Sequence, residues 1–201
     1  MKVRTEARRD AILEVASQVF LEMGFERASI AEIVKRIGGS KSTIYGYFPS
    51  KESLFLAVTH AAGERHMAAS ITELQSYSGQ DLEAVLVSFS VRLLEFLCSA
   101  EAIAAHRMVM GEAGNSDIGT MFYEAGPKRG LVAVAELFER AIAHGQLQGD
   151  DPWVMAQYFA SMANAEYQHR WFLKDAPPLK KAQIRQTAER AVGLFLRAFS
   201  Q

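Results

Sequence analysis

The polar residues with the most informative spacing lie in the segment 41–47. It begins with Lys41, Ser42 and Thr43 and continues to Tyr45 and Tyr47. The amine and hydroxyl groups of the first three can donate or accept hydrogen bonds at base edges in the major groove of DNA. Tyrosine hydroxyls suit phosphate oxygens, which fix a protein's register on a duplex. The segment therefore predicts a DNA contact.

Two short helices joined by a glycine turn must position this segment. Ser29, followed three residues later by Glu32, has the pattern of a capping box, so a helix is expected to begin at Ile30. Gly38 and Gly39 end it. A second short helix then follows the turn, and this arrangement is a helix-turn-helix.

Flanking residues define the second helix. Ser40 is placed to cap its start, and Pro49 limits its end because proline disfavours helical geometry in the residue before it. Ser50 then caps a third helix with Lys51 in its first turn, where free amides and the helix dipole favour phosphate. The side expected to be buried comprises Ile30, Ile33, Val34, Ile37, Ile44 and Phe48. An ordinary helical hairpin with a solvated polar face stays open at this point, because short helix-turn-helix patterns also arise by chance.

The same stretch resembles the DNA-binding signature of TetR-type transcriptional regulators. The similar residues are Ile30-Ala31-x-Ile33, Gly38, and Ser40-Lys41-x-Thr43-Ile44-Tyr45-x-Tyr47-Phe48-Pro49-Ser50-Lys51-Glu52-x-Leu54-Phe55. The resemblance implies an all-α fold: an N-terminal three-helix helix-turn-helix domain (1–50) and a larger C-terminal helical ligand-binding and dimerisation domain (51–201). It also implies a homodimer that represses transcription at a palindromic DNA operator and is released by a small apolar or amphipathic molecule.

By position, the resemblance implies that Lys41, Ser42 and Thr43 face bases, while Ser40, Tyr45, Tyr47 and Lys51 hold phosphates. Gly39 departs from the pattern, since members of the family usually carry a branched apolar residue after the turn glycine. Ile30 departs where some members carry a phosphate-binding hydroxyl. The segment 122–127 is similar, more weakly, to one in the AefR-like subgroup, and this match implies no particular ligand.

Charge does not by itself indicate nucleic-acid binding. The 201 residues carry a formal charge of -1, so no general basic field exists, although residues 1–60 hold nine Lys or Arg against seven acids. A few placed cations are enough for phosphate binding. Lys2, Arg4, Arg8 and Arg9 lie at the start of a predicted amphipathic helix (5–23), where they contact DNA or belong to a solvated terminus.

The single cysteine, Cys98, excludes an internal disulfide and is interpreted as a small core residue. No targeting segment is evident, and no apolar run reaches the roughly 18 residues that a membrane span requires. We therefore expect a cytoplasmic protein without membrane contact. Metal-ligand and catalytic spacings are also lacking, which predicts no enzyme, no metal and no cofactor.

Apolar periodicity predicts further helices over 50–77, 81–98, 100–112 and 121–143, with a restart or kink at Pro127. Two more are expected over 152–173 and 179–199, after a cap at Asp151. The resemblance implies that this last pair forms the homodimer interface; the alternative is that it only completes the core.

A lone polar residue on an apolar helix, His106, is a candidate for orienting a ligand. The remaining candidates for the effector pocket are large apolar or amphipathic residues, and packing of the core is the alternative for each of them. They are Phe89, Phe96, Met110, Phe122, Tyr158 and Met162. Two other functions stay open: a C-terminal domain that binds a protein partner, and a helix-turn-helix retained without DNA binding.

Overall fold

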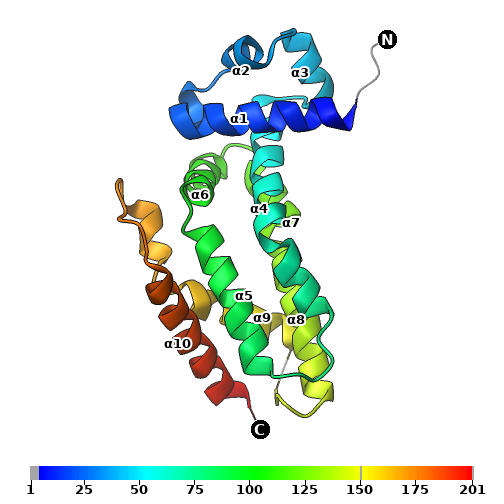
Figure 1. Cartoon of the computed structure of the whole chain (residues 1–201), viewed down its shortest axis with the longest axis vertical. Helices are drawn as coiled ribbons and strands as arrows, with labels where there is room; N and C mark the ends of the chain where they lie inside the picture. Colours follow the sequence, from blue (N-terminus) through cyan, green and yellow to red (C-terminus); the bar gives the residue numbers. More distant parts are fainter. Residues whose placement is uncertain (1–4, 150, 201) are drawn as a thin grey trace. The chain divides into compact units, whose positions relative to one another are not determined.

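The computed structural model describes residues 5–149 and 151–200, and every regular element in these ranges is helical (Figure 1). The elements are α1 (Glu6–Arg27), α2 (Ile30–Ile37), α3 (Lys41–Tyr47), α4 (Lys51–Gln75), α5 (Leu82–Leu97), α6 (Ala100–Glu112), α7 (Ile118–Ala125), α8 (Pro127–Ala143), α9 (Pro152–Asn164), a 3-10 helix (Gln168–Phe172) and α10 (Lys181–Phe199). The all-α prediction is confirmed. Lys2 and Arg4 lie outside the described residues.

Local capping signals set several helix ends. The Ser29 hydroxyl accepts a hydrogen bond from the backbone N–H of Glu32 at 3.2 Å, so α2 begins where the sequence predicts. The Glu32 carboxylate, expected to reach back to the cap, instead accepts from Nε of Arg36 at 3.0 Å. Asp151 accepts from the backbone N–H of Trp153 at 2.8 Å and caps α9. Only half of the predicted capping box therefore forms at α2.

The chain forms two compact units. The first comprises the chain up to Ala62 together with Ala100–Phe122, and the second comprises Gly63–Ser99 and the chain from Tyr123. This division differs from the predicted boundary after residue 50, because α6 packs against α1 and buries Ala105 in the core of the first unit. Both α4 and α7 begin in the first unit and end in the second.

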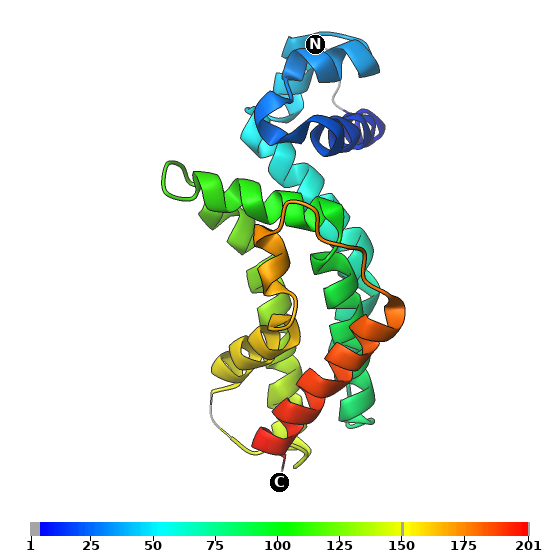
Figure 2. The same ribbon diagram turned by 90° about the vertical axis from the view of Figure 1, so that its left-hand side faces the viewer.

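In the first unit, α1 packs against α2 and α6, and α2 packs against α3 (Figure 2). Gly24, with φ of 75°, interrupts the helical geometry near the end of α1. Phe20, Phe25 and Phe55 make edge or stacked ring contacts, with centroids between 5.0 and 5.9 Å apart. The fully buried residues of this core include Ile12, Ala16, Val19, Ile33, Ile44 and Leu54. This core fixes the helices around the turn before α3.

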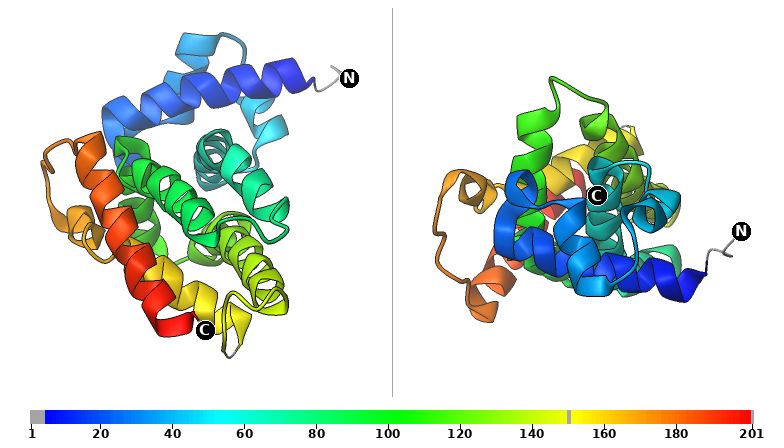
Figure 3. Two further views of the ribbon diagram at one scale, coloured as in Figure 1. Left: turned by 60° about the horizontal axis from the view of Figure 1, so that its bottom comes forward. Right: turned by 90° about the horizontal axis from the view of Figure 1, so that it is seen from above.

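In the second unit, α10 packs against α5 and α9, and α8 packs against α9 (Figure 3). Three phenylalanine rings meet at the centre of this unit. The Phe138 and Phe195 rings stack with centroids 4.8 Å apart, while Phe159 meets both rings edge-on, at 5.8 Å and 5.3 Å respectively. All three side chains are fully buried, so they join α8, α9 and α10 into one core.

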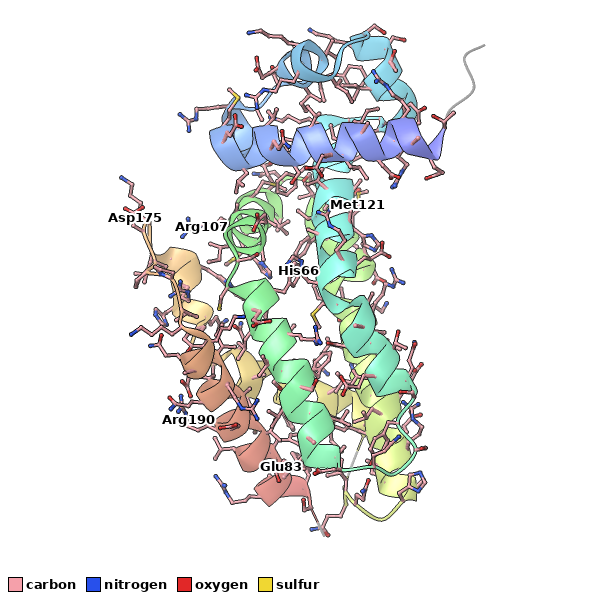
Figure 4. The ribbon with its side chains drawn as sticks, viewed as in Figure 1. His66, Glu83, Arg107, Met121, Asp175 and Arg190 are labelled. Atoms are coloured by element: carbon pink, nitrogen blue, oxygen red, sulfur yellow. The ribbon has the colours of Figure 1, made fainter. Side chains whose placement is uncertain are left out.

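The helix predicted over 152–173 is shorter in the structure. It ends at Asn164, and a separate 3-10 turn follows. Between the two, the Glu166 carboxylate accepts hydrogen bonds from the Thr187 hydroxyl at 2.7 Å and from Nε of Arg190 at 2.8 Å. Both donors belong to α10, where Figure 4 marks Arg190. This attachment to a distant helix accompanies the departure from helical geometry, and no local sequence pattern reports it.

Other predictions concern single residues and sites that the structure describes. Cys98 is half-buried, and burial raises the pKa of its thiol, with a smaller opposing effect from Arg170. None of the helices in the described ranges combines the length and the apolar character of a membrane span. No group of three or more potential metal ligands occurs among the same residues.

Candidate DNA interface

The turn before α3 is built from two glycines and a capping serine. Gly38 ends α2 with φ of 73°, and Gly39 follows with φ of 106°, both in the region that favours glycine. The Ser40 hydroxyl then accepts a hydrogen bond from the backbone N–H of Thr43 at 3.1 Å. The chain therefore reverses within a few residues and starts α3 with its first turn exposed.

The two faces of α3 differ in chemistry. Ile44 is 1% exposed and packs into the core of the first unit, as does Phe48, the residue that ends the helix. Lys41 and Ser42 are exposed, and Tyr45 leaves 48% of its surface accessible. An amine and two hydroxyls thus face solvent from a helix whose other side is anchored.

Thr43 and Ser40 contact each other. Their hydroxyl oxygens lie 3.0 Å apart, and either hydroxyl can be the donor. Thr43 is half-buried, whereas Ser40 is exposed. Both residues therefore hold the start of α3 in this structure, and their predicted contacts to base and phosphate use hydroxyls that already have a partner.

Tyr47 joins α3 to the start of α1. Its hydroxyl accepts a hydrogen bond from the backbone N–H of Thr5 at 2.9 Å, and its side chain is half-buried. Thr5 is the N-cap of α1 and accepts from the backbone N–H of Arg8 at 3.2 Å. This contact joins residues 42 positions apart and places the first turn of α1 beside α3, hereafter the recognition helix.

Lys51 lies at the start of α4, and its ammonium group faces the end of α1. Nζ donates to the backbone carbonyl of Phe25 at 2.9 Å, with longer contacts to the carbonyls of Glu26 and Ala28 at 3.5 and 3.4 Å. It also lies 4.1 Å from the centroid of the Phe25 ring. The sequence predicted that this ammonium contacts a phosphate, and in the structure it donates to backbone carbonyls of the same unit instead.

These acceptors lead to a prediction for Lys51→Met. We expect the free energy of unfolding to fall by about 1–2 kcal/mol, because a cation that satisfies partly buried carbonyls is lost. The dependence of DNA affinity on salt is expected to stay unchanged. Chemical denaturation and a salt titration of DNA binding measure the two effects. The matched variant, Lys41→Met, should leave the stability unchanged and weaken binding to DNA, because it removes a predicted base contact. A smaller salt slope in Lys51→Met would restore Lys51 as a phosphate contact.

Among the basic residues of the first unit, Arg36 is neutralised by two carboxylates. Its guanidinium lies 2.8 Å from Glu22 and 3.0 Å from Glu32, and hydrogen bonds to these carboxylates raise its pKa. Within the described residues, Arg8, Lys35 and Lys41 have no carboxylate partner. Their charges are therefore available to an anion.

The residues predicted to line an effector pocket fall in both units. In the first, the His106 ring meets the Phe122 ring edge-on, with centroids 5.3 Å apart, while Met110 is exposed. In the second, Phe89 is buried with its ring 6.3 Å from that of Phe159. Among these candidates, the rings of His106 and Phe122 contact each other within one unit, and the pocket remains a prediction.

The remaining three candidates lie in the second unit. The Phe96 ring lies 5.5 Å from the ring of His66, which Figure 4 labels. Met162 is half-buried against the aromatic core, and Tyr158 is 53% exposed on α9. A groove of about 410 Å³ also occurs in this unit, and it contains none of the predicted residues. Its lining is Ala84, Val87, Ser88, Val91, Arg92, Glu95 and Arg185.

His106 provides a pH-dependent test of the packing in the first unit. Burial lowers the pKa of its imidazole, and a hydrogen bond between Nδ1 and the Ala102 carbonyl, 2.8 Å long, opposes this effect. The unfolded chain therefore binds the proton more readily, and stability should fall as the pH drops below the unfolded pKa of about 6.5. We expect His106→Gln to reduce the loss of stability between pH 7.5 and 5.5. Denaturation at both pH values measures it, and the exposed His169→Gln serves as control. An identical pH dependence in wild type and His106→Gln would contradict the assignment.

Comparisons with known proteins agree with this geometry. The family model described as "Bacterial regulatory proteins, tetR family" matches residues 12–58. A second model, "AefR-like transcriptional repressor, C-terminal domain", matches residues 84–201. The weak resemblance noted at residues 122–127 is therefore confirmed at the level of the subgroup.

Two curated relatives align with the N-terminal part of the chain. The uncharacterized HTH-type transcriptional regulator YvdT of Bacillus subtilis is 40% identical over 58 residues, which are 29% of this chain and 30% of that protein. The HTH-type transcriptional repressor AcnR of Corynebacterium diphtheriae is 36% identical over 72 residues, 36% of this chain and 35% of that protein. The chain thus spans about a third of the length of these curated relatives.

Solved structures match over the whole length. The crystal structure of a TetR-family transcriptional regulator from Mesorhizobium loti superposes with a TM-score of 0.87 and covers all of both chains at 24% identity, which shows the fold. The flavonoid-responsive regulator FrrA gives a TM-score of 0.71 at 30% identity, over 98% of both chains. With the helix-turn-helix described above and a family model that matches more than half of its length, the chain belongs to the TetR family of transcriptional regulators.

Proposed function

We propose that this regulator represses transcription by binding a palindromic operator as a homodimer and is released by a small apolar or amphipathic molecule. The observation that carries the proposal is the division of α3 between a buried face and an exposed polar face. Ile44 anchors the helix, while Lys41, Ser42 and Tyr45 face solvent. A helix presented in this way fits the major groove of DNA.

Contacts to bases and to phosphates have different roles on this surface. Lys41 and Ser42 begin the exposed face and supply a donor amine and a hydroxyl for base edges. The Tyr45 hydroxyl, on the same helix, suits a phosphate oxygen. Thr43, Ser40 and Tyr47 remain proposed contacts, although their hydroxyls are already bonded within the unit. Lys51 is expected to bind the carbonyls at the end of α1 rather than a phosphate.

The last two helices support the homodimer. The two helices pack against each other, and each exposes one large hydrophobic side chain. Tyr158 on α9 is 53% exposed, and Leu194 on α10 is also 53% exposed. We infer that these two positions on neighbouring helices belong to a two-fold interface with a second copy. A two-fold dimer in turn matches the symmetry of a palindromic operator.

Release by an effector follows from differential affinity. A small molecule that binds better to a conformation unsuited to the operator weakens DNA binding by the ratio of its two affinities. We propose that α4 transmits the change, since this one helix begins in the first unit and ends in the second. The name of FrrA describes that protein as flavonoid-responsive, which supports a small amphipathic effector for this chain.

Selection of bound sequences from random duplex DNA tests the proposal. Enrichment of an inverted repeat by the folded, ligand-free protein, in a complex containing two copies of the chain, is the expected result. Addition of apolar and amphipathic compounds to that complex should then identify one that releases the DNA. Failure to enrich any sequence would contradict operator binding and favour a C-terminal domain that serves a protein partner.

A further inference from the structure

Gly39 has a backbone conformation that favours glycine, and the side chain of Arg8 lies against this glycine. Its φ is 106°, so a side chain there would be strained. A Cβ atom built on Gly39 would lie 3.1 Å from Nη2 of Arg8 and 3.9 Å from the Thr43 hydroxyl oxygen. The guanidinium of Arg8 therefore lies directly against the position where a side chain at residue 39 would begin.

Arg8 reaches this place from the first turn of α1. Nη2 donates a hydrogen bond to the backbone carbonyl of Gly38 at 2.7 Å. Gly38 ends α2, so the guanidinium holds the turn that leads into α3. Thr5 caps the same turn of α1 and is itself bonded to Tyr47, which fixes the first turn of α1 beside the recognition helix.

The other N–H groups of the Arg8 guanidinium are available to an anion. Arginine carries five N–H donors in a planar fork, and one of them serves the Gly38 carbonyl. Within the described part of the chain Arg8 has no carboxylate partner, in contrast to Arg36, whose charge two glutamates balance. A cation held by a neutral carbonyl retains its full charge for DNA.

We propose that Arg8 is a further DNA-binding residue, which Gly39 makes room for. The guanidinium is held on the Gly38 carbonyl, stabilises the turn before α3, and directs its free N–H groups to a backbone phosphate of the operator. The pairing accounts for glycine at position 39, because a side chain there crowds the Arg8 guanidinium against the Gly38 carbonyl. The inference rests on the proposed function, since it concerns the same DNA complex.

Two substitutions at Arg8 test the role of its charge. Arg8→Gln removes the charge and carries its amide on a shorter side chain, whereas Arg8→Lys keeps the charge and an N–H donor. Binding to the selected duplex is measured as a function of salt for both variants. Arg8→Gln removes one phosphate contact from each copy of the dimer. It is therefore expected to lower the slope of log affinity against log salt by about 1.8, about 0.9 for each copy, and to weaken binding roughly 100-fold, about tenfold for each copy. Arg8→Lys is expected to keep the wild-type slope.

A matched control and a second position complete the test. Arg27, at the opposite end of α1, also donates from its side chain to a backbone carbonyl, that of Met23 at 3.0 Å, and Arg27→Gln should leave slope and affinity unchanged. Gly39→Ala should lower the slope as Arg8→Gln does, although Arg8 is still present.

The outcomes distinguish this inference from the proposed function. A wild-type slope in Arg8→Gln, or weaker binding without a change of slope, would overturn the phosphate contact while wild-type binding upholds the proposed function. An unchanged slope in Gly39→Ala would overturn the pairing with Arg8. If the wild-type protein binds no duplex at any salt concentration, the proposed function and this inference fail together.

Discussion

Leu194→Arg is expected to convert the protein to a monomer and to weaken binding to a two-half-site operator by at least about 100-fold. Leu194 is 53% exposed on α10, so an arginine there is tolerated in the isolated chain. In a two-fold interface the substitution occurs twice and buries two like charges without partners, which costs several kcal/mol. A monomer can hold only one half-site, and it loses the gain from simultaneous attachment of two recognition helices.

Sedimentation of the variant and titration with the selected duplex measure both effects. Val132→Arg on α8 is the control, because Val132 is also an exposed aliphatic residue on a helix of the second unit but lies outside the proposed α9–α10 interface. It should remain dimeric and bind as the wild type does. A Leu194→Arg variant that stays dimeric and binds with unchanged affinity would exclude this face of α10 from the interface.

Phe195→Ala, one position further along the same helix, is expected to lower the free energy of unfolding by about 3–5 kcal/mol. Phe195 is fully buried, and its ring contacts those of Phe138, Phe159 and Phe199. Truncation removes apolar contacts and leaves a cavity where three helices meet. Urea denaturation of variant and wild type at one protein concentration measures the loss, since dimerisation makes apparent stability depend on concentration.

The matched control is Phe172→Ala, the same chemical change at a phenylalanine with 74% of its surface exposed. Because most of this ring is already exposed to solvent, its truncation removes little buried apolar area. We expect the free energy of unfolding to change by less than about 1 kcal/mol. Equal losses in the two variants would mean that the ring cluster does not carry the stability of the second unit.

Local signals in the sequence were sufficient to predict the helices around the DNA interface. Ser29 and Ser40 each cap the helix that follows, because a hydroxyl needs only the next three residues to find its backbone donor, and Asp151 caps α9 of the second unit in the same way. The buried position of Ile44 follows likewise from helical periodicity.

Contacts between residues distant in sequence could not be predicted in this way. The ammonium of Lys51 meets a carbonyl 26 positions earlier, and the Tyr47 hydroxyl meets a backbone N–H 42 positions earlier. Both are settled by how α1 packs against the turn and α4, which periodicity does not specify. The end of α9 at Asn164 has the same origin, since Glu166 is held by α10.

The glycine at position 39 was an informative sequence signal, but it did not identify Arg8 as the residue in contact with it. The glycine at position 39 indicated that the turn lacks the side chain usual in the family, and the structure identifies the guanidinium that lies there. A pair of glycines can only report that space or unusual backbone geometry is needed. The residue that uses the space comes from another helix, and only the tertiary structure reveals it.

The measurement that tests the central claim most directly is binding to duplexes in which the distance between the two selected half-sites is changed. A dimer places two recognition helices on one face of the DNA, about one helical turn apart. An insertion of about 5 base pairs, half a turn, moves one half-site to the opposite face. We predict that this insertion lowers the affinity to that of a single half-site and that the native spacing gives a complex with two protein chains. Equal affinity for both spacings would contradict an operator-binding dimer.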